Sequence, residues 1–76
     1  MELSSFIANV AEQFMDTDAA VFKANTKFKE LDEWSSLMAL AVIAMVDECY
    51  HVRLKGVDIR ESITIEDLFM KVNSLI

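Results

Sequence analysis

The sequence predicts an all-α fold: a small four-helix bundle of three main helices and one short helix, with a long loop between helices 1 and 2. The chain contains no proline and one glycine, the two residues that disfavour helix most strongly. Apolar residues recur every three or four positions in three separate segments, which places them on one face of a helix. At 76 residues and 54% hydrophobic content, we expect one domain, residues 1–76, with an apolar core.

The first helix is predicted at about residues 2–14. Its apolar positions form one stripe: Leu3, Phe6, Ile7, Val10, Ala11 and Phe14. Residues 15–35 lose this pattern and read as a loop rich in turn-forming Asp, Asn and Thr. A short helical turn is expected near 18–23. Scattered apolar residues should anchor this loop across the bundle: Phe22, Phe28, Leu31 and Trp34.

The second helix is expected to run to about Tyr50, with either Ser35 or Ser36 as its N-terminal cap. Its core face is predicted to hold Ala39, Val42, Ile43, Val46 and Tyr50. The other early positions are apolar too, and a bundle of this size cannot surround a helix that is hydrophobic on every side. We therefore expect an exposed partner-binding surface, unless the long loop covers it, among Leu37, Met38, Leu40, Ala41 and Met45.

The C-terminal third predicts one short and one longer helix. Residues 51–56 form a connector, in which Gly56 suits a tight turn, and residues 57–61 form a single helical turn. Thr64 and Asp67 resemble a capping box that starts a helix over about 65–74. We expect one core that contains Phe6, Val10, Phe14, Val42, Ile43, Val46, Leu68 and Phe69.

Composition argues against several classes of function. A net charge of −6 disfavours nucleic acid and anionic membranes. One cysteine, Cys49, and one histidine, His51, argue against a zinc site and fit a reduced, cytoplasmic setting. The longest apolar run, Leu37 to Val46, has ten residues, about half of what a membrane span needs. No nucleophile–base pair, paired catalytic carboxylates or phosphate-cradling loop stands out, so we expect no enzyme.

The order of these elements, and the residues around Ser36, resemble the acyl carrier protein family. In that family a serine in an Asp-Ser-Leu motif opens the second helix of a four-helix bundle, and Ser35-Ser36-Leu37 stands at the matching place here. The similarity covers nearly the whole chain, including the acidic segment 28–34 before the motif, the short third helix and the final segment 64–68.

The resemblance implies that Ser36 carries a covalent 4′-phosphopantetheine arm, whose terminal thiol holds acyl or related groups as thioesters. The implied partners are a phosphopantetheinyl transferase and the enzymes that load and process the acyl group, and we expect a monomer. Two features depart from the family pattern: Ser35 replaces the aspartate, and no acidic residue occurs between Leu37 and Val46. Partner contact should then be more apolar than is usual, with Asp47 and Glu48 at its far end.

A second interpretation remains open from the same residues. The chain would be an unmodified helical interaction module that binds partners through its apolar second helix. Addition of one phosphopantetheine group to Ser36 by a transferase would distinguish the two.

Overall fold

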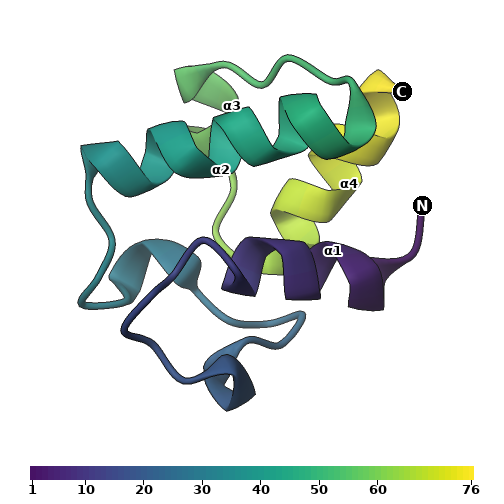
Figure 1. Cartoon of the computed structure of the whole chain (residues 1–76). Helices are drawn as coiled ribbons and strands as arrows, with labels where there is room; N and C mark the ends of the chain where they lie inside the picture. Colours follow the sequence, from purple (N-terminus) through teal and green to yellow (C-terminus); the bar gives the residue numbers. More distant parts are fainter.

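A computed structural model describes residues 1–76 and confirms the predicted all-α bundle (Figure 1). Four α-helices and two short 3₁₀ turns make up the regular structure, and there is no strand. The helices are α1 (Leu3–Ala11), α2 (Ser36–Tyr50), α3 (Gly56–Glu61) and α4 (Ile65–Leu75). The 3₁₀ turns, Ala19–Val21 and Phe28–Glu30, lie in the long loop between α1 and α2.

The core lies where α1, α2 and α4 meet. Side chains from all three helices and from the loop are fully buried there: Phe6, Val10, Phe28, Val42, Val46, Ile65, Leu68 and Val72. Phe14 is buried as predicted, whereas Ile43 and Phe69 are half-buried and pack against the edge of the core. In Figure 1, α2 lies above α1, while α3 stands beside the N-terminal half of α2.

Aromatic side chains anchor the long loop beneath the bundle, as the sequence predicts. The ring of Phe14 lies 5.0 Å from that of Phe22 and 6.3 Å from that of Trp34. The Trp34 ring in turn meets Phe28 edge-on at 5.2 Å. Main-chain bonds add a second tie, because the carbonyl oxygens of Ala24 and Thr26 accept from the first turn of α4. The loop is thus part of the packed structure, although it is irregular.

Two expected boundaries differ from the observed ones. Helix α1 ends at Ala11, and residues 12–14 continue only as a turn. The chain then turns away because the Glu33 carboxylate accepts from the backbone N–H groups of Met15 and Asp16, at 2.8 and 3.0 Å. This contact joins residues far apart in the sequence, so local periodicity could not predict it.

The turn assigned to Gly56 is also in the wrong place. Gly56 is the first residue of α3 and has no positive φ. The residue that leaves the right-handed region is His51, with φ 58° and ψ 36°, at the C-terminal cap of α2. A left-handed residue is a common way to end a helix. Thr64 and Asp67 do form the predicted capping box at the start of α4.

Candidate functional site

Ser36 is the first residue of α2, and the adjacent serine caps the helix. The Ser35 Oγ accepts a hydrogen bond from the Met38 N–H at 3.2 Å, and the Ser35 carbonyl accepts from the Ala39 N–H. Ser35 is therefore the N-cap, which resolves the alternative that the sequence left open. The Ser36 side chain is exposed, and its hydroxyl makes no hydrogen bond within the protein.

The start of α2 is an electropositive point on an acidic protein. The N–H groups of Ser36 and Leu37 precede the first intrahelical bond and have no main-chain partner. No acidic residue stands in the first turn of the helix. These N–H groups and the helix dipole favour a negative charge next to Ser36.

A cleft opens between α2 and α3 beside Ser36. Its volume is about 640 Å³, within the range of small-molecule sites. Both serines stand in its lining, together with Trp34 from the loop. Helix α2 contributes Ala39, Leu40 and Ile43, while Lys29, Gly56, Ile59 and Arg60 complete the walls. The sequence does not reveal this cleft, because its walls come from three separate segments.

Polar contacts hold α3 in place as one wall of this cleft. The Lys29 Nζ donates to the carbonyl oxygens of Ile59 and Arg60 at 3.0 and 2.9 Å, which satisfies the C-terminal end of the helix. From the other side, Lys71 of α4 lies 3.9 Å from Asp58 and 3.6 Å from Glu61. Ile59 is the α3 side chain that is buried in the core.

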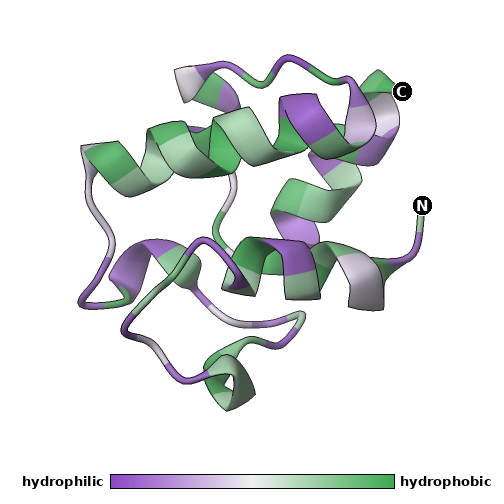
Figure 2. Ribbon diagram, viewed as in Figure 1, coloured by the Kyte–Doolittle hydropathy of each residue, from purple (hydrophilic) through white to green (hydrophobic).

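The predicted partner surface on α2 is partly correct. Leu37 and Leu40 are 76% and 61% exposed, and the charged pair Asp47 and Glu48 is exposed as well. Figure 2 shows that apolar residues cover most of α2, whereas hydrophilic residues interrupt α1 and α4. The loop does not cover these leucines, so an exposed apolar surface is present on α2.

The expectation that Met45 is exposed is wrong. Met45 is 6% exposed and belongs to the core, while Met38 and Ala41 are half-buried. Successive residues of an α-helix are rotated by about 100° around its axis. On that scale the buried face of α2 lies about 60° from the predicted core face, on the side of Met38 and Met45. A helix that is apolar on every side has no strong stripe from which its rotation can be predicted. For this reason the predicted exposed surface did not include Ala44, which is exposed.

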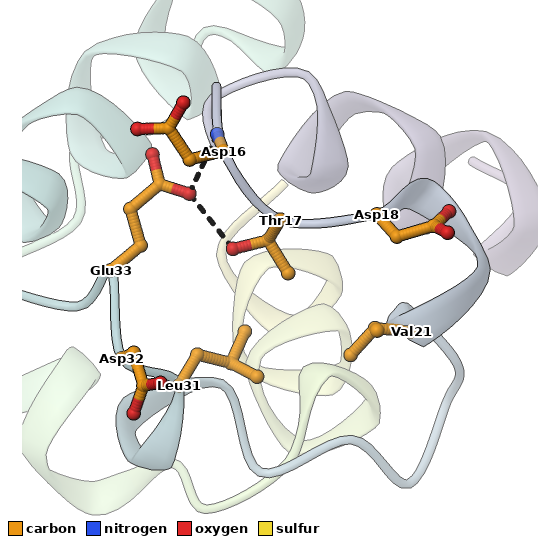
Figure 3. A pocket seen from close by; sticks show the side chains of 7 residues that line it. All are labelled: Asp16, Thr17, Asp18, Val21, Leu31, Asp32 and Glu33. Atoms are coloured by element: carbon orange, nitrogen blue, oxygen red, sulfur yellow. Dashed lines mark hydrogen bonds between the residues drawn. The ribbon is translucent and has the colours of Figure 1, made fainter.

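A second hollow, of about 450 Å³, lies in the long loop and has acidic walls (Figure 3). The Glu33 carboxylate accepts from the Thr17 hydroxyl at 2.8 Å as well as from two backbone N–H groups. Desolvation tends to raise the pKa of Glu33, but these hydrogen bonds outweigh it and hold the pKa below its usual range. The carboxylates of Asp16, Asp18 and Asp32 point in different directions. The hollow therefore reflects a structural tie between two parts of the loop.

No group of three His, Cys, Asp or Glu side chains is arranged to hold a metal ion. None of the helices has both the length and the apolar character that a membrane crossing requires. Comparison with known proteins found no matching family model, no matching curated protein and no matching solved structure.

Proposed function

We propose that this chain is a carrier domain whose Ser36 accepts a 4′-phosphopantetheine arm and presents acyl or related groups to partner enzymes. The observation that carries the proposal is the position of Ser36: an exposed, unbonded hydroxyl at the first residue of α2, on the wall of the α2–α3 cleft. The resemblance of the Ser35-Ser36-Leu37 segment to the acyl carrier protein motif points to the same residue.

The start of α2 suits a phosphodiester. Once the arm is attached, its negative charge lies beside the free N–H groups of Ser36 and Leu37. Helix N-termini favour such charges through both hydrogen bonding and the helix dipole. The absence of acidic residues from the first turn removes a source of repulsion. This environment supports attachment at Ser36 but does not require any catalytic group from the chain.

Serine in place of the family's aspartate leaves the helix start intact. Serine and aspartate are equally preferred N-caps, and the Ser35 Oγ accepts the Met38 N–H in the way an aspartate carboxylate would. The Ser35 Oγ accepts the capping bond, whereas the Ser36 hydroxyl takes part in no hydrogen bond within the protein. This departure from the family motif is therefore compatible with the proposed attachment.

The chain would be the substrate of a transferase. Serine is a weak nucleophile without a base, and the hydroxyl of Ser36 has no hydrogen-bonded base in the protein. In the proposed step the Ser36 Oγ forms a bond to the phosphorus that bears the pantetheine. The bond from this phosphorus to the oxygen that bridges the two phosphorus atoms of coenzyme A breaks, adenosine 3′,5′-bisphosphate leaves with that oxygen, and a base of the transferase takes the hydroxyl proton. The attached arm then supplies the thiol that forms the thioester.

The α2–α3 cleft offers a place for the attached group to lie. Ala39, Leu40 and Ile43 give it an apolar wall on α2, and burial of a methylene group stabilises by about 0.8 kcal/mol. Ser36 lies in the same lining, so an arm fixed there reaches the cleft without crossing the protein.

The exposure of Leu37 and Leu40, 76% and 61%, favours a second candidate function. Exposed apolar patches commonly mark interaction sites. An unmodified module that binds partners through α2 would use the same two residues. It would leave the Ser36 hydroxyl without a role.

Intact-mass measurement tests the carrier proposal. We expect the protein, incubated with coenzyme A and a transferase of broad specificity, to gain the mass of one phosphopantetheine group. A known carrier domain in the same reaction controls for the activity of the transferase. An unchanged mass beside a fully converted control would favour the interaction module.

A further inference from the structure

Arg60 is an unpaired cation on the wall of an apolar cleft. Its guanidinium takes part in neither of the two ion pairs of the protein, both of which belong to Lys71. The chain has thirteen acidic and seven basic residues, so carboxylates are numerous, yet none of them pairs with Arg60. The charge of Arg60 is thus left available to a molecule in the cleft.

The guanidinium of Arg60 lies beside Gly56, the only glycine of the chain. A Cβ atom at Gly56 would lie 3.4 Å from Arg60 Nη1 and has no other near neighbour. The Arg60 side chain therefore reaches back over the first turn of α3, along the wall that Gly56 also lines.

The other cation of the cleft is already engaged. The Lys29 Nζ donates to the carbonyl oxygens of Ile59 and Arg60 and so completes the end of α3. The free N–H groups at the start of α2 suit a different group, the phosphate of an arm on Ser36. Arg60 is the remaining positive group, and its neighbours in the lining are apolar: Ala39, Leu40, Ile43 and Ile59.

We propose that the α2–α3 cleft takes an apolar chain that bears a carboxylate, with Arg60 as the counter-ion. Charge complementarity carries the choice of occupant: the planar guanidinium matches a carboxylate with two parallel hydrogen bonds, and the apolar walls match a methylene chain. The identification of this apolar ligand with the cargo of the arm rests on the proposed function. The cargo is then an acyl group that has a second, free carboxylate.

Free amphiphiles test the cleft without any arm on Ser36. The probes share one chain length and differ in head group: decanoate, decanol and decyltrimethylammonium, titrated at low ionic strength and followed by amide chemical shifts of Ala39, Ile43 and Ile59. We expect decanoate to bind about three- to fivefold more tightly than decanol, the worth of a partly exposed ion pair. The cationic probe should bind most weakly, although the net charge of −6 by itself favours it.

Two matched variants assign the selectivity to one residue. Arg60→Gln should make decanoate and decanol bind equally, while Arg53→Gln, an exposed arginine outside the cleft lining, should leave the difference intact. Equal binding of decanoate and decanol to the unaltered protein, no binding of either, or the same effect from both variants overturns the proposal. Displacement of decanoate by equimolar inorganic phosphate also overturns it, because Arg60 would then serve the phosphate of the arm. None of these results depends on modification of Ser36, so the carrier proposal stands or falls separately.

Discussion

The two adjacent serines at the start of α2 differ in their hydrogen bonding. The Ser35 Oγ is occupied by the Met38 N–H, whereas the Ser36 hydroxyl is free. The sequence predicts that one of the two caps the helix, and the resemblance to carrier proteins selects Ser36 for modification. Only the hydrogen bond shows which serine does the capping. At this scale the motif predicts the residue, and the structure shows that its neighbour, Ser35, accepts the capping hydrogen bond.

Glu33 makes the stability of the loop depend on pH. Its lowered pKa means that the unfolded chain binds a proton at a higher pH than the folded one. The stabilisation is therefore fully present above the usual pKa of glutamate and is lost as the pH falls through the lowered value. We expect Glu33→Gln to lower the free energy of unfolding at neutral pH, and to reduce its decline toward acid pH.

Denaturant unfolding at a series of pH values measures this effect. Glu30→Gln is the matched control, since Glu30 lies in the same loop, is exposed and accepts no hydrogen bond from another residue. Identical pH profiles for the two variants would show that the contacts from Thr17 and the Met15–Asp16 backbone do not stabilise the loop.

At the scale of elements, α2 shows the limit of what the periodicity of apolar residues predicts. α1 and α4 carry clear stripes, and the predicted core residues Phe6, Val10 and Leu68 are buried, together with Ile65 and Val72 of α4. Helix α2 is apolar on nearly every side, so its sequence predicts a helix but not its rotation. Contacts with α1 and the core set that rotation, which buries Met45 and leaves Leu40 outside.

The partner surface of α2 should depend more on apolar contact than on charge. We expect Leu40→Ala to weaken binding of the transferase by about 2 kcal/mol or more, if Leu40 becomes a buried anchor. A double Asp47→Asn, Glu48→Gln variant should cost about 1 kcal/mol or less, because exposed charge pairs are screened by water and salt. Titrations of both variants at two salt concentrations compare the two contributions. A larger loss for the charge variant, with steep weakening of the native complex by salt, would contradict this account.

At the scale of the whole molecule, the sequence predicts the helices and most of the core but not the cleft. Helix order and capping follow from local pattern, as at Thr64 and Asp67. The cleft requires α2, α3 and the loop at once, and its wall is held by Lys29, which lies some thirty positions before its acceptors Ile59 and Arg60. Such distant pairings have no local signal, which is why Lys29, Gly56 and Arg60 were absent from the predicted site.

Attachment at Ser36 is the central claim, and the intact masses of Ser36→Ala and Ser35→Ala after the transferase reaction test it most directly. We expect Ser36→Ala to stay unmodified with its helical circular dichroism nearly unchanged, because the cap belongs to Ser35. Ser35→Ala should still gain one phosphopantetheine group, although loss of the cap costs about 1 kcal/mol of stability. If Ser36→Ala gains the group and Ser35→Ala does not, the modified serine is Ser35 and the account of the site is wrong.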